Sequence, residues 1–306
     1  MFRTFACTWA IRIARLLAIT APLALMPAAH AADEARPDGQ QAWDEAATVA
    51  QSGPVDIKLL DKAVLKLPEG RIFIPQPQAT KLLQAMGNPG EDPRLQGLVF
   101  PKGEEQGWFM TVRYEDSGHI KDDDAKDWNA DDLLQSFKEG TEESNKEREK
   151  MGVPALEIIG WAEKPAYEAS THRLVWAMSS REKGSTDTDD QGVNYNTYLL
   201  GREGYFSMNL VTGLKELPAH KPDGQAMLAA LNFNDGQRYS DFDEKTDHVA
   251  EYGLAALVLG VGAKKLGLLA AAGVFFAKFA KLFIFGGLGL LALVGKLFSR
   301  KSKPTA

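Results

Sequence analysis

Apolar and polar residues alternate in two segments near the middle of the chain, a pattern typical of β-strands. The alternation runs from Trp108 to Tyr114 and again from Val193 to Leu199, and we expect a half-buried strand at each place. Apolar runs predict further strands at 156–161, 174–178 and 205–211. The residues Gly201–Gly204 predict the turn that joins the last strands into an antiparallel meander.

Helical patterns are fewer. They predict short helices at 41–50, 80–86 and 222–231, and a long helix at 130–151 that Asn129 caps and Gly152 ends. The second half of the long helix, 141–150, is almost wholly polar, so we expect it to face solvent or a partner. Strands that cluster after one long helix predict an α+β class, with a mostly antiparallel sheet, flanking helices and a C-terminal transmembrane helix.

The first 32 residues have the order of a secretory signal peptide. Three arginines precede an apolar run from Leu16 to Met26, and small residues follow at 29–32. The run covers about half of a bilayer, which favours a cleaved signal over an uncleaved anchor. The single cysteine, Cys7, lies inside this segment. A mature protein would therefore have no thiol for a disulfide, a metal site or a nucleophile.

The C-terminal region predicts a membrane anchor. Its uncharged stretch, 282–295, covers only about 21 Å as a helix, short of the roughly 30 Å hydrocarbon core. We therefore expect a span at 277–298, preceded by an amphipathic juxtamembrane helix at 251–276 and followed by a basic cytoplasmic tail at 299–306. The side chains expected at the membrane interface are Lys264, Lys278, Lys281, Lys296 and Arg300.

These five basic residues fall on one stripe, roughly 100° wide, around a helix axis. Such a stripe is also typical of a helix that lies on an anionic membrane surface, or of one that packs with copies of itself. Both alternatives stay open beside the single span. With an exported main domain, the single span predicts a protein of the bacterial inner membrane whose domain is periplasmic.

Charge divides the chain into three parts. All 41 acidic residues lie between Asp33 and Glu251 with 24 of the 35 basic residues, so this segment has a net charge of −17. An acidic domain between basic ends argues against nucleic acid as a partner. It fits a domain held outside a membrane whose anionic surface attracts the basic ends. We divide it into an N-terminal helix and linker at 33–54 and an acidic α+β domain at 55–250.

The densest acidic run, 121–127, follows the end of a predicted strand. Carboxylate oxygens suit calcium or magnesium, but the calcium-loop pattern fails because Lys126 and Asp127 stand where a ligand and a glycine are required. We expect a solvated loop that caps the next helix, with no metal and no cofactor. The ligand-binding candidates in this run are Asp122, Asp123, Asp124 and Asp127.

Three other groups of residues are candidates for chemistry. Glu115 with Asp116 or Asp122 can supply the two carboxyls of a carbohydrate-active or other hydrolase. Asn194 and Asn196 would project from one strand face, as a polar ligand surface or a cross-strand hydrogen-bond ladder. The four histidines after the signal, at positions 119, 172, 220 and 248, lack paired ligand spacing, and we expect them to be structural or exposed.

A series of short motifs runs through the chain from about residue 60 to the anchor. They include Leu67–Gly70, Met86–Asn88, Tyr114–Gly118, Lys121–Ala125, Thr171–Ala177, Val193–Thr197, Leu200–Gly204 and Ala250–Leu254. In this order they resemble the bacterial membrane-anchored family called domain of unknown function 2167. The resemblance implies no established activity and supplies no catalytic residues, although a label on regulation of amylopullulanase accompanies the family. Tyr198 stands where the family usually has arginine.

These observations predict a non-enzymatic binding or regulatory module of the cell envelope, with the lipid bilayer and an envelope protein as partners. The first alternative is the hydrolase that uses acidic residues around 115–127. The second is a membrane-associated oligomer that works through its lysine-striped C-terminal helix.

Overall fold

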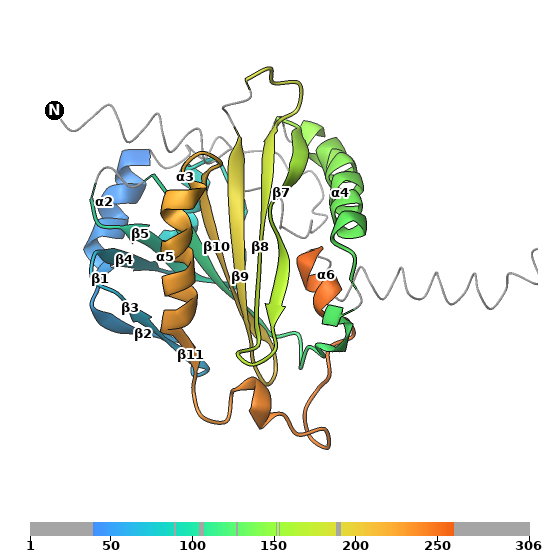
Figure 1. Cartoon of the computed structure of the whole chain (residues 1–306). Coiled ribbons are helices and arrows are strands. Elements are labelled where there is room, and N and C mark those ends of the chain that lie inside the picture. The colour runs from blue at the N-terminus through green and yellow to red at the C-terminus, as the bar shows by residue number, and fades with distance from the viewer. Residues whose placement is uncertain are drawn as a thin grey trace, which may run out of the picture. The chain divides into compact units, whose positions relative to one another are not determined.

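A computed structural model describes residues 39–259, apart from 89, 104–106, 127, 151, 153 and 188–190. Its larger sheet has eight strands in the order β1-β4-β5-β6-β10-β9-β8-β7, and every neighbouring pair is antiparallel (Figure 1). The strands are β1 (Gln51–Ser52), β4 (Arg71–Pro75), β5 (Leu95–Pro101), β6 (Phe109–Glu115), β7 (Leu156–Glu168), β8 (Arg173–Glu182), β9 (Gly192–Leu200) and β10 (Tyr205–Gly213).

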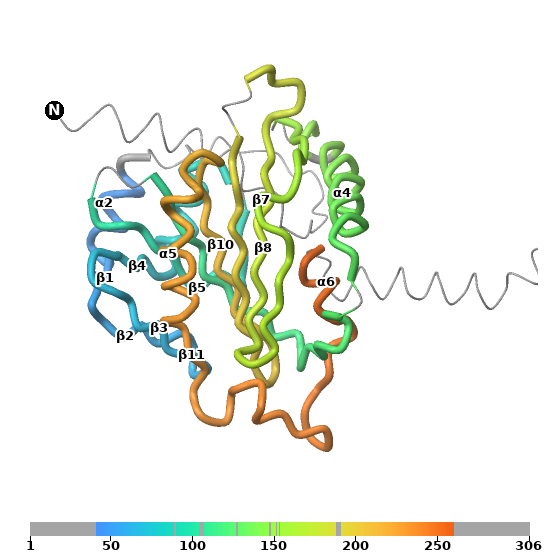
Figure 2. The backbone as a smooth tube through the Cα atoms, viewed as in Figure 1, coloured from blue at the N-terminus to red at the C-terminus, as the bar shows by residue number. Residues whose placement is uncertain are grey.

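A smaller antiparallel sheet has the order β11-β3-β2. Its strands are β2 (Val55–Leu59), β3 (Ala63–Leu67) and β11 (Leu231–Phe233). The backbone trace shows it beside the lower end of helix α5 (Leu217–Ala230), which runs along one face of the larger sheet (Figure 2). The predicted α+β class with a mostly antiparallel sheet is therefore confirmed.

Two hydrophobic cores lie on opposite faces of the larger sheet. Met110, Val112 and Tyr195 point into the core that the smaller sheet and α5 cover. Phe109 and Val211 point the other way, into a core with α2 (Gly39–Val49) and α3 (Gln78–Ala85). Successive side chains of a strand alternate between faces, so β6 and β10 contribute to both cores.

The expectation of half-buried strands was wrong for β6 and β9. All nine residues of β9 are buried, and so are five of the seven residues of β6. Polar residues occupy alternate positions of β9, at Asn194 and Asn196, yet both of these side chains are buried as well. Alternation in a sequence shows that two faces differ, but it does not show that one of them meets water.

The four helices predicted between residues 41 and 231 are present, and one of them begins at a clearly different residue. Asn129 caps α4 (Ala130–Lys150) as expected, since its Oδ1 accepts the N–H of Asp131 at 2.8 Å. Helix α5 begins at Leu217, five residues before the predicted start at Pro222. Another proline occupies the first turn of α5, where a missing N–H costs nothing, and Pro222 is accommodated inside the helix.

The polar half of α4 packs against the sheet through hydrogen bonds. Asn145 is buried, and its amide exchanges two hydrogen bonds of 2.8 Å with the backbone of Leu156 in β7. Arg148 donates to the carbonyl oxygen of Pro154 at 2.7 Å. The prediction that this half faces solvent or a partner therefore missed a buried polar stripe. An apolar pattern cannot reveal such a stripe.

Within the described part of the chain, no helix combines the length and the apolar character needed to cross a membrane. The predicted signal at 1–32, the span at 277–298 and the basic tail lie outside the described residues, and so does the predicted juxtamembrane helix from residue 260 on; its described part contains the short helix Leu254–Val258. The same is true of the five basic residues expected at the membrane interface.

Gly204 offers a test of how tightly β6 and β10 are joined. A Cβ atom there would lie 2.1 Å from the backbone oxygen of Glu115, whereas a Cβ at Gly160 would meet nothing within 4 Å. We expect Gly204→Ala to lower the free energy of unfolding by about 1–3 kcal/mol. Gly160→Ala should leave it unchanged or slightly raised. Chemical denaturation measures both, and equal effects would contradict the close approach.

Candidate functional site

The acidic run is divided between different partners. Asp122 accepts a hydrogen bond of 2.8 Å from the hydroxyl of Tyr167. Asp124 accepts the N–H groups of Leu254 and Ala255, both at 3.0 Å, and so caps helix α6 (Leu254–Val258). Among the described residues, no group of three His, Cys, Asp or Glu side chains is arranged to hold a metal ion. Asp127 lies outside the described residues.

Asp122, Tyr167 and His172 form a hydrogen-bonded chain. Tyr167, near the end of β7, donates to Asp122, and its hydroxyl oxygen lies 3.1 Å from Nδ1 of His172, which directly precedes β8. Since the tyrosine hydroxyl donates to the carboxylate, the phenolic oxygen accepts a hydrogen bond from the Nδ1–H of His172. This assignment leaves Nε2 of His172 as the acceptor. The side chains of Asp122 and His172 are 28% and 29% exposed.

A stack of four aromatic rings, here called the ring stack, begins at His172. Tyr239 lies 4.0 Å from His172 and 4.2 Å from His119 between ring centroids, and Phe242 lies 3.9 Å from His119. The hydroxyl of Tyr239 donates to the carbonyl oxygen of Ile120 at 2.8 Å. The stack thus fastens the segment after α5 to the loop after β6.

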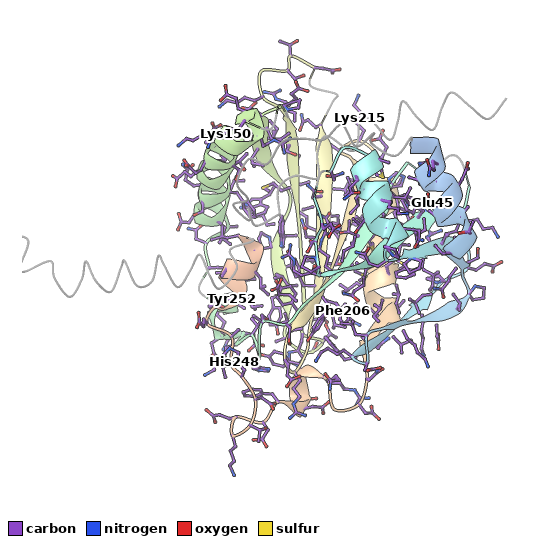
Figure 3. The ribbon with its side chains drawn as sticks, turned by 180° about the vertical axis from the view of Figure 1, so that it is seen from behind. Glu45, Lys150, Phe206, Lys215, His248 and Tyr252 are labelled. Atoms are coloured by element: carbon purple, nitrogen blue, oxygen red, sulfur yellow. The ribbon has the colours of Figure 1, made fainter. Side chains whose placement is uncertain are left out.

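The backbone continues this attachment toward α6. The N–H of His119 donates to the oxygen of His248 at 2.8 Å, and the N–H of Ala250 donates back to the oxygen of His119 at 2.9 Å. Figure 3, seen from behind, shows His248 and Tyr252 on the segment that leads to α6. The ring stack and the Asp124 cap therefore hold one continuous segment in place.

Burial sets the charge of the two stacked histidines. It lowers the pKa of His119 and of His172, because a buried imidazolium loses hydration, while Asp122 acts in the opposite direction. Both rings are therefore neutral at neutral pH. A neutral His172 whose Nε2 accepts a proton can serve as a general base or as a ligand-binding group.

Glu115 belongs to a different network. Arg94 donates to Glu115 at 3.1 Å and binds both carboxylate oxygens of Asp92, at 2.8 and 3.0 Å. Arg113 donates to the same Asp92 at 2.9 Å. These contacts tie the start of β5 to β6. Among the described residues, no hydrogen bond joins Glu115 to Asp122. Asp122 is instead part of the chain with Tyr167 and His172.

Asp116 and the asparagines make local contacts. The hydroxyl of Tyr114 lies 3.5 Å from Asp116, a long hydrogen bond. Asn194 and Asn196 point to the same face of β9, as predicted from their spacing, and both are buried. The amide of Asn196 donates to the backbone oxygen of Asn194 at 3.1 Å. This contact lies within one strand, whereas the expected ladder would join two.

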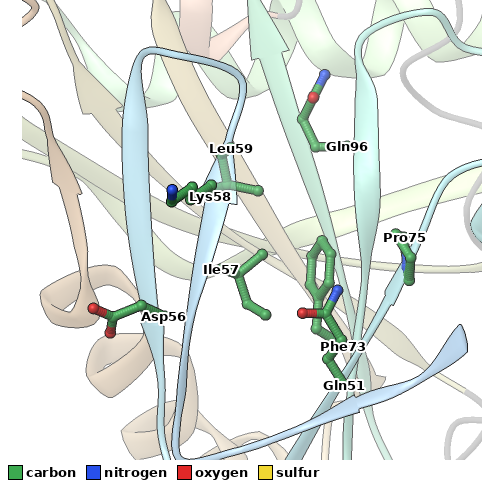
Figure 4. Close-up of a pocket in the computed structure, with 8 residues that line it drawn as sticks. All are labelled: Gln51, Asp56, Ile57, Lys58, Leu59, Phe73, Pro75 and Gln96. Carbon is green, nitrogen blue, oxygen red and sulfur yellow. The ribbon is translucent and has the colours of Figure 1, made fainter.

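A pocket of about 370 Å³, here called the seam pocket, lies where the two sheets meet. Its lining comes from β1, β2, β4 and β5: Gln51, Asp56, Ile57, Lys58, Leu59, Phe73, Pro75 and Gln96. Figure 4 shows Ile57 and Leu59 on the pocket side of β2 and Asp56 on the other side. Among the described strands, β2 pairs with β3 alone, so its second edge is unpaired beside this pocket.

The sequence pointed to Asp122, but it did not reveal the groups around it. Tyr167 lies 45 residues after Asp122 in the sequence, and the β7–β8 turn places His172, five residues further on, beside it, while Tyr239 comes from the segment after β11. The seam pocket was missed as well. Its only sequence signal is the short alternating run 55–59, which reads as an ordinary strand.

Comparison with known proteins identifies a family and gives weak structural similarities. The family model described as "Protein of unknown function (DUF2167)" matches residues 51–289. No curated protein matches the chain. Cyanobacterial PsbP from Synechocystis sp. PCC 6803 is similar at 11% identity and a TM-score of 0.36, over 60% of this chain and 91% of its own. A protein of unknown function from Pseudomonas aeruginosa gives 12% identity and a TM-score of 0.21, over 57% and 93%. Such low scores carry no functional argument.

Three buried or partly buried histidines predict that acid destabilises the domain. Burial lowers the pKa of His119, His172 and His220 in the folded state, so as pH falls below about 6.5 the unfolded chain binds protons first. The stability that these neutral rings contribute is complete above that pH and is lost as pH falls toward the folded pKa values. We expect a lower free energy of unfolding at pH 5.5 than at pH 7.5.

Denaturant titrations at the two pH values measure this difference. A His119→Phe, His172→Phe double variant keeps two aromatic rings in the stack without their titration, and its pH dependence should be smaller. An unchanged pH dependence in the double variant would contradict the assignment to these rings.

Proposed function

The chain belongs to this family of proteins of unknown function, and we propose that its domain is a non-enzymatic protein-binding module in which an extended segment of polypeptide adds to the free edge of β2. The observation that carries the proposal is the unpaired edge of β2 beside the seam pocket. An unpaired edge presents a row of N–H and C=O groups, and another strand is the partner that satisfies them regularly.

Side chains around β2 support this assignment. The large hydrophobic side chains that are exposed in the described structure are Val55, at 37%, and Leu60, at 49%, and they stand at the two ends of β2. The seam pocket adds the apolar faces of Ile57, Leu59 and Phe73. A strand added to β2 would place every second side chain over these apolar groups, which supplies selectivity beyond the backbone hydrogen bonds.

The cell envelope is the setting that we propose for this module. The support comes from the sequence alone: a signal-like N-terminus, an acidic segment of net charge −17 and an apolar C-terminal segment with basic flanks. On this proposal the protein is retained in the bacterial inner membrane by a single span, and its domain meets an envelope protein in the periplasm. Cell fractionation with protease protection tests the placement, and a protease-resistant domain in cells with a permeable outer membrane would contradict it.

A synthetic peptide tests strand addition directly. The probe is a seven-residue peptide that alternates valine and threonine, which matches the two faces of a strand beside β2. We expect it to bind the full-length chain. Gln51→Trp should weaken binding roughly tenfold by filling the seam pocket, while Gln135→Trp, on the exposed side of α4, should not.

Two N-methylated forms of the peptide separate strand addition from simple apolar contact. One is methylated at the odd amides and the other at the even amides, so each loses the donors along one edge. Only one edge of the added strand faces β2, so one form should lose binding and the other should keep it. Equal binding of both forms, measured by fluorescence anisotropy, would refute strand addition.

A second candidate function is hydrolysis. The chain from Asp122 through Tyr167 to His172 favours it, because it orients a neutral imidazole whose Nε2 can accept a proton. We expect Asp122→Asn to abolish any hydrolysis of cell-envelope glycans by the purified chain, whereas Asp123→Asn, its exposed neighbour, should preserve it. Absence of glycan hydrolysis in the unmodified chain would contradict this second candidate function.

A further inference from the structure

We infer that the strand that adds to β2 is β2 of a second copy of this chain, so that two smaller sheets join into one sheet across a two-fold axis. The inference rests on the proposed strand addition and names its partner. The observation behind it is the sequence of β2 itself, Val-Asp-Ile-Lys-Leu, read together with the face on which each side chain lies.

Antiparallel pairing of β2 with itself is complementary at every position when it is centred on Ile57. Asp56 then lies opposite Lys58 of the second copy, and the same pair recurs on the other side of the axis. Val55 lies opposite Leu59 of the second copy. Opposite charges directly across an antiparallel pair stabilise it, and so do paired aliphatic side chains.

Other registers of the same pairing are unfavourable. Centring on Asp56 sets two aspartates opposite each other, and centring on Lys58 does the same for two lysines. A shift of one residue would turn Asp56 and Lys58 toward the apolar side. Parallel pairing in register sets each charge opposite its own copy. The register centred on Ile57 is therefore expected to be more stable than each of these alternatives.

The exposed and buried faces of β2 agree with this register. Asp56 and Lys58 are exposed, and neither side chain makes a hydrogen bond or ion pair with another described residue, so both are available to a partner strand. Val55, which is 37% exposed, would be covered by Leu59 of the second copy. The two Ile57 side chains would meet beside the seam pocket, above Phe73.

Symmetry makes the contact self-limiting. A two-fold axis through Ile57 uses the free edge of β2 in both copies, so no second β2 edge remains for growth. Pairing in this way protects an edge that would otherwise invite aggregation.

Charge exchange tests the register without disturbing the core, because both side chains are exposed. In the full-length chain in detergent, Asp56→Lys alone and Lys58→Asp alone each convert two attractive pairs into two repulsive ones. Each should weaken dimerisation roughly tenfold. The double variant Asp56→Lys, Lys58→Asp restores opposite charges and should dimerise like the unmodified chain. A mixture of the two single variants should form the mixed dimer. In one variant both positions are lysine and in the other both are aspartate, so the two strands attract each other.

Analytical ultracentrifugation with two labelled forms measures these outcomes. Cross-linking adds a register test: in a Cys7→Ser background, Asp56→Cys mixed with Lys58→Cys should form a disulfide between copies faster than either variant alone. A dimer that is indifferent to the charge variants, or a monomeric unmodified chain, overturns the inference.

These failures can be told apart from failure of the proposed function. If the chain is monomeric but binds the valine–threonine peptide with the expected N-methyl pattern, strand addition stands and the second copy is not its partner. If neither the peptide nor a second copy binds, strand addition itself is wrong. If both bind, the peptide should dissociate the dimer, because the two compete for one edge.

Discussion

Burial of the central strands on both faces is the constraint on which the rest of this structure depends. β6 and β10 place one set of side chains in the core beneath α5 and the smaller sheet, and the other set in the core with α2 and α3, while all nine residues of β9 are buried. A strand in this position cannot tolerate an unpaired backbone group, because no water reaches it. Antiparallel neighbours on both sides meet this requirement, so irregular features are confined to the ends of the strands and to the edges of the sheets.

Polar residues in such a structure are used for attachment. Asp124 caps α6, Asn145 fastens α4 to β7, and Arg94 bridges Asp92 and Glu115. Of these residues, Asp124 and Glu115 are candidates for chemistry in the sequence, yet each satisfies backbone or charged groups that burial would otherwise leave without partners. Asp122 differs, since its chain through Tyr167 ends at His172, a neutral ring with an acceptor nitrogen. That arrangement is the strongest ground for the hydrolase alternative.

The edges of the two sheets differ in how they are protected. At one end of the larger sheet, β1 has only two residues, and at the other end α4 packs beside β7. Short strands and covering helices are ordinary ways of blunting an edge. β2 has neither protection, and its flanking side chains are apolar and exposed. A partner strand would pair the free backbone groups of this edge, and the order of charges in β2 favours an identical strand as the partner.

The sequence by itself determined the class of the fold, the helices near 41–50, 80–86 and 130–151, the antiparallel meander and the family. These depend on local periodicity, caps and turn residues, and all three can be identified from residues that are close together in the sequence. Tertiary structure alone decided that β9 is buried on both faces, that Asp124 caps a helix 130 residues away, and that His119 and His172 share one stack with Tyr239. It also decided that β2 keeps a free edge. Each of these features depends on which distant segments of the chain are in contact, and a local sequence pattern does not predict such contacts.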